Sequence, residues 1–183
     1  MDEKPAPNPD RLAAMAHYVI ARCAPEELGA TKLTKVLWFT DVFHYRRHGK
    51  TVSGARSYIK RQFGPVPPGI TQAIEALKRA GKISERSAVT PAGIRREFVW
   101  LQEPDVSAFT PEEIDMLNEV MALVCKNHSA ASISELTHDS LWSETLLGAE
   151  IPIGAASVVA GEVTPEVMAW ATVALEGAIG GLI

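Results

Sequence analysis

A chain of 183 residues with 46% hydrophobic and 22% charged residues is long enough to fold as one domain with a substantial core. It contains no apolar run of about 18 residues, which excludes a long apolar membrane helix, and its acidic, proline-rich start lacks the pattern of a signal peptide. We therefore expect a cytoplasmic location, no membrane partner, and two cysteines, Cys23 and Cys125, that behave as small buried residues in a reducing compartment.

The net charge of −4 hides an asymmetry along the chain. Residues 1–101 contain 17 Lys and Arg against 9 Asp and Glu, a net charge of +8, while residues 102–183 contain one Lys against 13 Asp and Glu, a net charge of −12. This split predicts either two faces with different partners or acidic and basic surfaces of one domain that complement each other.

Two helices are predicted in the first quarter of the chain. Residues 1–8 form a polar, proline-broken stretch that we expect to be disordered, ahead of a single domain over residues 9–183. An apolar face at three- and four-residue spacing predicts a helix over Pro9–Cys23, ended by Pro25 and Gly29. A broader apolar stripe predicts a second helix, residues 31–48, at the centre of the core.

The end of this second helix carries basic residues and a possible metal spacing. Arg46, Arg47 and His48 place positive charge where the helix dipole is negative. Asp41, His44 and His48 have a spacing that could hold a metal ion, but no glutamate base or further ligand accompanies them. The favoured interpretation is therefore that the two histidines simply lie near a helix end. We expect no metal, cofactor or catalytic residue.

A proline-rich corner follows. Residues 50–57 are polar and predict a short strand and turn. In Gly64–Pro68, three prolines fix the backbone angle φ and remove three hydrogen-bond donors, which predicts a rigid corner rather than a flexible linker. An apolar face at helical spacing then predicts a third helix over Ile70–Gly81.

Residues 82–101 predict a β-hairpin with arms at 83–89 and 94–101. Arg86, Arg95 and Arg96 make this hairpin basic. A helix followed by a basic hairpin is typical of the recognition helix and wing of a winged-helix DNA-binding protein, whereas the alternative is a hairpin that covers one end of a helical core.

The acidic part of the chain begins with a linker, residues 105–109, and a capping box at Thr110–Glu113. A second box at Ser132–Glu135 predicts a short helix. His138 and Trp142 would touch if that helix continued, a pairing that suits packing better than catalysis. Residues 148–161 predict a loop or strand, and an extra helix from Thr164 leads to an apolar tail that either packs or serves as a handle for a partner or protease.

Several motifs in order resemble the Panacea domain of the SocA-like bacterial and phage antitoxins. The matching residues lie within about 9–153, and the most specific piece is Phe63-Gly64-Pro65-Val66-Pro67. The other pieces are Lys32-Leu33-Thr34-Lys35-Val36-Leu37-Trp38-Phe39, Gly49-Lys50-Thr51-Val52-Ser53-Gly54, Glu135-Leu136-Thr137-His138-Asp139, Trp142 and Gly148.

The resemblance implies an antitoxin without enzymatic activity that binds a cognate toxin, either masking it or delivering it to the ClpXP protease. For the fold, we expect a mainly α protein of the α+β class, with about six helices around one core and a small hairpin between the third and fourth. The acidic half is one candidate surface for a basic toxin. The other candidate partner-binding residues are Arg46, Arg47, Arg61, Phe63, Pro65, His138 and Trp142.

Overall fold

The computed structural model describes residues 9–91 and 93–159. Its helices are α1 (Pro9–Arg22), α2 (Pro25–His48), α3 (Ile70–Arg79), α4 (Pro111–Met121), a π-helical turn η1 (Ala122–Lys126), α5 (Ala130–Glu135), α6 (Ser140–Glu144) and α7 (Ile153–Val159). Its strands are β1 (Ser57–Arg61), β2 (Gly64–Val66), β3 (Ile83–Thr90), β4 (Gly93–Trp100) and β5 (Glu150–Pro152). The protein is therefore a mixed α and β fold in which helices predominate.

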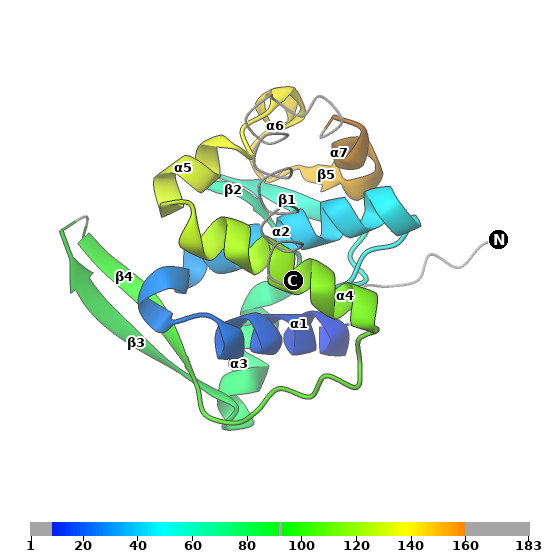
Figure 1. Cartoon of the computed structure of the whole chain (residues 1–183). Helices are drawn as coiled ribbons and strands as arrows, with labels where there is room; N and C mark the ends of the chain where they lie inside the picture. The colour runs from blue at the N-terminus through cyan, green and yellow to red at the C-terminus, as the bar shows by residue number, and fades with distance from the viewer. Residues whose placement is uncertain (1–8, 92, 160–183) are drawn as a thin grey trace, which may run out of the picture.

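The long helix α2 lies at the centre of the fold (Figure 1). It packs against α1 and α4, and α7 lies across its other side, together with α5 and α6. The core around it divides into two clusters that share Phe39 and Phe43. The larger one lies among α1, α2, α3 and α4, and the smaller one joins Trp38 to Tyr58 and Ile151 of the sheet. The prediction that this helix is central is confirmed.

The start of α2 differs from the prediction. The helix begins at Pro25 rather than Thr31, because proline is tolerated in the first helical turn, where its missing N–H has no partner to lose. Gly29, with a φ of 59° and a ψ of 168°, is not helical and separates this first turn from the rest of α2, so the uninterrupted helix begins close to the predicted Thr31. At the other end, Gly49 caps the helix in the left-handed conformation and donates its N–H to Tyr45 O.

Three short strands form an antiparallel sheet in the order β2-β1-β5. The predicted strand within residues 50–57 is wrong, because this segment is turn and coil until Ser57, where β1 begins. β1 pairs with β5 through Tyr58 and Ile151 and with β2 through Lys60 and Pro65. The segment predicted as a loop or strand at 148–161 contains β5 and then α7, as far as residue 159.

The hairpin β3–β4 follows α3 and precedes α4 in the chain, and it lies at one edge of the fold, where β4 packs against α2 (Figure 1). Ile83 and Phe98 near its base are buried, whereas the cross-strand pair Val89 and Ile94 at its tip is exposed. The base of the hairpin therefore covers the core, and the tip is an arm.

The capping box of α4 is confirmed, since Thr110 and Glu113 each satisfy the backbone N–H of the other. The second box begins three residues earlier than predicted, because Ser129 caps α5 and exchanges hydrogen bonds with Ser132. The helix does not continue past Glu135, and Asp139 caps a separate helix, α6. The predicted tail at 1–8, the helix from Thr164 and the apolar end lie outside the described residues.

Candidate functional site

A buried lysine on α2 joins three parts of the fold. The Lys35 side chain has no exposed surface, and its Nζ donates hydrogen bonds to Phe63 O and to Thr137 Oγ1, the latter at 2.6 Å. Among the described residues it forms no ion pair, and burial lowers the pKa of its ammonium to about 7. Lys35 thus connects α2 to the β1–β2 turn and to the turn between α5 and α6.

The position next to Phe63 accepts only glycine. Gly64 has a φ of +117°, and a Cβ placed on it would lie 1.8 Å from Lys35 Nζ and 2.7 Å from Thr137 Oγ1. A side chain here would therefore displace the lysine as well as strain the backbone. This explains physically why the Phe63–Pro67 motif contains a glycine.

A second lysine holds α6 above the sheet. Lys60 Nζ donates to Trp142 O at 2.6 Å and to Thr145 O at 2.8 Å, and it lies 3.9 Å from the centroid of the Trp142 ring. The Trp142 ring stacks on His138 at 3.6 Å. Burial, followed by the charges of Lys35 and Lys60, lowers the pKa of His138, so this histidine is neutral at pH 7. We call Lys35, Lys60, Gly64, Thr137 and Trp142 the lysine junction.

Large apolar side chains are exposed on the loops that the lysine junction holds. Phe63 is 63% exposed, Leu146 79% and Leu147 70%, with Leu136 less so. The carbonyl of Phe63 accepts from Lys35, Leu136 precedes Thr137, and Leu146 follows Thr145. We call Phe63, Leu136, Leu146 and Leu147 the apolar surface. It consists of exposed apolar side chains on loops whose backbone is held by Lys35 and Lys60, and exposed apolar groups of this kind mark protein-binding sites.

A groove of about 610 Å³ borders this surface and reaches the hairpin arm. Phe63 and Ile94 of β4 both line it. The remaining lining comes from the first turns of α2, residues 26–32, from the tip of the hairpin β3–β4, and from Ser129 and Ala130 around the start of α5. The groove gives the apolar surface a concave neighbour that a protruding segment of a partner could enter.

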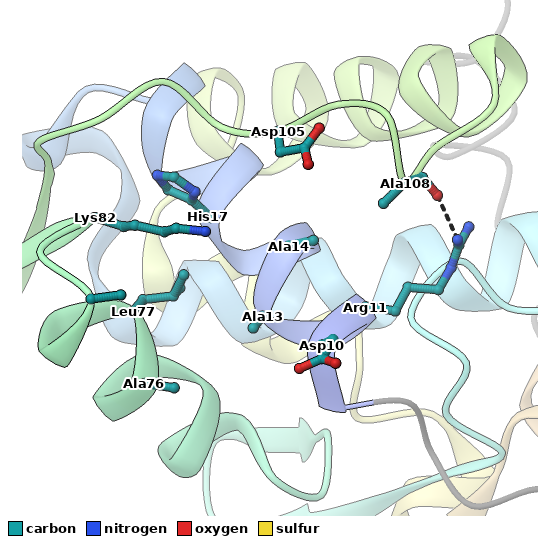
Figure 2. Close-up of a pocket in the computed structure, with 11 residues that line it drawn as sticks. Asp10, Arg11, Ala13, Ala14, His17, Ala76, Leu77, Lys82, Asp105 and Ala108 are labelled. Atoms are coloured by element: carbon teal, nitrogen blue, oxygen red, sulfur yellow. Dashed lines mark hydrogen bonds between the residues drawn. The ribbon is translucent and has the colours of Figure 1, made fainter.

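A second pocket, of about 480 Å³, lies between α1, α3 and the linker before α4 (Figure 2). Arg11 crosses to Ala108 O at 2.6 Å on one side of it, and Lys82 points towards His17 on the other. Burial lowers the pKa of His17, whose Nε2 lies 3.0 Å from Gln102 O. Its lining mixes alanines with charges of both signs and includes none of the residues predicted to bind a partner.

The structure brings together four of the seven predicted partner-binding residues. Arg61 at the end of β1 and Phe63 on the β1–β2 turn are exposed, and His138 and Trp142 are half-buried in and beside the lysine junction. Pro65 is buried in β2, opposite Lys60, so it shapes the turn and a partner cannot contact it directly.

Arg46 and Arg47 lie elsewhere. They are 11 and 12 residues beyond Lys35 on α2, which is about 16 Å along the helix axis. Arg47 lies 3.6 Å from Glu119 of α4. The predicted basic helix end is therefore a contact between two helices and is not part of the apolar surface.

Asp41 and His44, whose spacing with His48 suggested a metal site, make hydrogen bonds within the protein instead. The Asp41 carboxylate is buried and accepts hydrogen bonds from Ser53 and Tyr58, and His44 Nδ1 lies 2.7 Å from Lys50 O. No cluster of three possible metal ligands occurs within residues 9–91 and 93–159. In the same ranges, no helix has the length and apolar character needed to cross a membrane.

The sequence analysis did not predict that Leu136, Leu146 and Leu147 would be exposed. It also did not predict that Lys35 and Lys60 would hold the loops that carry them. The Leu146-Leu147 pair directly before Gly148 was an available signal, since two large apolar residues ahead of a glycine turn have little room in a core. The lysines gave no signal, because their partners are distant in the sequence.

A family model described as the antitoxin SocA-like Panacea domain matches residues 33–143. The matched segment begins in α2 and ends in α6, so it contains every residue of the lysine junction. No curated protein and no solved structure matches the chain.

Proposed function

Because the chain belongs to the SocA-like antitoxin family with a Panacea domain, we propose that it is an antitoxin that neutralises one toxin by binding it directly. The observation that carries the proposal is the apolar surface held by the lysine junction. Its loops are already fixed by Lys35 and Lys60, so binding there loses little conformational freedom. Phe63 and the nearby Arg61 are exposed and belong to residue types that are enriched in protein interfaces.

Two modes of neutralisation are compatible with such a surface. In the first, the antitoxin covers the working surface of the toxin. In the second, it binds the toxin and delivers it to the ClpXP protease. Direct masking is the simpler mode, because it requires only the apolar surface and the adjoining groove.

A growth assay tests the proposal. The reading frame encoded beside this chain is expressed alone and then with the chain, in hosts with and without ClpXP. We expect growth arrest from the neighbour alone and recovery with the chain in both hosts. Recovery only in the host that has ClpXP would show that the chain delivers the toxin to the protease and does not mask it. A neighbour that is harmless alone would contradict the antitoxin proposal.

A DNA-binding regulator is the second candidate, because the order of helix α3 and hairpin β3–β4 matches a helix and wing. The charges of this hairpin disfavour it. Arg86 and Arg95 pair with Glu97 at 2.9 and 2.5 Å, and Arg96 pairs with Glu85 at 2.7 Å. The paired carboxylates offset the positive charge of these guanidinium groups and so weaken their attraction to phosphate.

Titration with duplex DNA at low ionic strength separates the two candidates. We expect no binding that weakens steeply with salt, since such binding requires the release of counterions by several phosphate contacts. Salt-dependent binding that disappears in the triple variant R86A, R95A, R96A would favour the regulator instead.

A further inference from the structure

The two cysteines of the chain lie against each other. Cys23 follows α1 and Cys125 lies in η1, 102 residues later, yet their Sγ atoms are 3.3 Å apart. Both are free thiols and both are buried, at 8% and 6% exposed. This distance is a hydrogen-bonding contact between sulfurs, and the antitoxin proposal makes no use of it.

The surroundings make the two thiols unequal. The hydrogen bond shared with Cys23 lowers the pKa of Cys125, and so does the charge of Lys32, whose Nζ donates to Cys125 O at 3.1 Å, while burial and the charge of Glu27 oppose this effect. The same hydrogen bond and burial raise the pKa of Cys23. Because the positive charge of Lys32 lies beside Cys125, this sulfur is the better placed of the two to ionise, and Cys23 Sγ, 3.3 Å away, can react with it in a second step.

We propose that Cys23 and Cys125 form a reversible intramolecular disulfide when the protein meets a peroxide. The Cys125 thiolate attacks one peroxide oxygen, the O–O bond breaks, and Cys125 becomes a sulfenic acid while one water leaves. The Cys23 sulfur then attacks the sulfenic sulfur, forming the S–S bond and releasing a second water. Two thiols and one hydrogen peroxide thus give one disulfide and two waters, and a dithiol reductant reverses the change.

The position of the cross-link connects it to the groove beside the apolar surface. Residues 26–32, which begin three residues after Cys23, form one part of the groove lining. Ser129 and Ala130, which begin four residues after Cys125, form another. The disulfide would tie these two parts of the lining together covalently, so oxidation would fix the shape of the groove that the proposed toxin-binding surface adjoins.

Peroxide treatment of the purified full chain tests the inference without any toxin. After treatment with hydrogen peroxide, we expect both thiols to become unavailable to alkylation in denaturant, and the intact mass to fall by about 2 Da. The midpoint temperature of unfolding should rise by roughly 5–10 °C, since the cross-link closes a long loop. Dithiothreitol should restore both thiols and the original midpoint.

Two variants provide matched controls. In C23A, Cys125 should form a sulfenic acid that a dimedone probe traps, because the second thiol is absent. In C125A, Cys23 should remain reduced under the same treatment. The inference is overturned if the wild-type chain keeps two alkylatable thiols, if it cross-links only between chains, or if the disulfide forms equally fast in urea-unfolded protein.

Discussion

At the scale of single residues, two buried ionisable groups on α2 connect this helix to the loops around it. Lys35 binds the β1–β2 turn and Thr137, and Asp41 binds Ser53 and Tyr58. Burial lowers the pKa of Lys35 to about 7 and raises that of Asp41 to about 6, although hydrogen bonds from Ser53 and Tyr58 partly offset the latter. Both groups therefore titrate near neutral pH.

The stability of the protein should depend on pH through Lys35. Between pH 7 and about 10.5 the unfolded chain holds a proton on this lysine that the folded chain has lost, so the free energy of unfolding rises with pH, by at most about 1.4 kcal/mol per unit. Asp41 acts oppositely, because the folded chain holds the extra proton between about pH 4 and 6 and loses stability as pH rises. Urea unfolding from pH 6.5 to 9 measures the slope.

The K35M variant isolates the lysine contribution. At high pH it should unfold more easily than the wild type, because Phe63 O and Thr137 Oγ1 lose their donor, and its slope above pH 7 should be flatter than in the wild type. An unchanged slope would show that Lys35 keeps its proton in the folded state.

Removing the Asp41 carboxylate should destabilise the fold more than removing one of the donors that bind it. The D41A variant leaves the buried Ser53 and Tyr58 donors without their carboxylate, and we expect it to lower the free energy of unfolding by roughly 3 kcal/mol. The Y58F variant removes only one donor, the Tyr58 hydroxyl, and keeps the ring that packs against Trp38. We expect it to lower the free energy of unfolding by about 1 kcal/mol. Equal losses in the two variants, measured by urea unfolding, would rule out the carboxylate as the hub of this network.

At the scale of elements, the β1–β2 turn depends on the lysine junction as much as on its own residues. Gly64 and Gly49 both have positive φ, but an added Cβ meets Lys35 Nζ at the first and nothing within 4 Å at the second. The two glycines thus separate the cost of backbone strain from the cost of a collision with the junction.

The G64A variant should lose clearly more stability than G49A. We expect about 1 kcal/mol for G49A, from backbone strain alone, and roughly 3 kcal/mol or more for G64A, which also displaces the buried ammonium. Thermal unfolding of both variants measures the difference. Similar losses would mean that the turn and the lysine move apart without cost.

The elements that sequence alone could predict are those specified locally. The capping box of α4 joins residues three apart, and the last turn of α2 ends at its own glycine. The additional first turn of α2 at Pro25 and the cap of α5 at Ser129 were not predicted, because neighbouring prolines and serines offer alternative helix starts a few residues apart. The lysine junction joins residues 28 and 102 apart, so no local pattern predicted it.

The candidate site was predicted in part for the same reason. Phe63 and Arg61 follow from residue type and the adjoining proline corner, and the His138–Trp142 stack follows from spacing. The burial of Pro65 and the exposure of Leu146 depend on the pairing of β1 with β2 and β5, which links distant segments.

At the scale of the whole molecule, the ion pairs lie in different places from the exposed apolar side chains. The basic end of α2 faces α4, and the hairpin arginines pair with glutamates on the same hairpin. The apolar surface lies on the other loops, over the lysine junction. Much of the positive charge counted along the sequence is thus used within the fold, which leaves apolar side chains on fixed loops as the strongest feature for a protein partner.

The most direct measurement is the affinity of this chain for the toxin that the growth assay identifies. The triple variant F63S, L146S, L147S should bind at least about 100-fold more weakly than the wild type, because each anchor contributes on the order of 1–2 kcal/mol. The matched control L101S, V106S, which changes exposed apolar residues on the linker before α4, should bind like the wild type. Wild-type affinity in a triple variant that unfolds normally would contradict the apolar surface as the toxin-binding site.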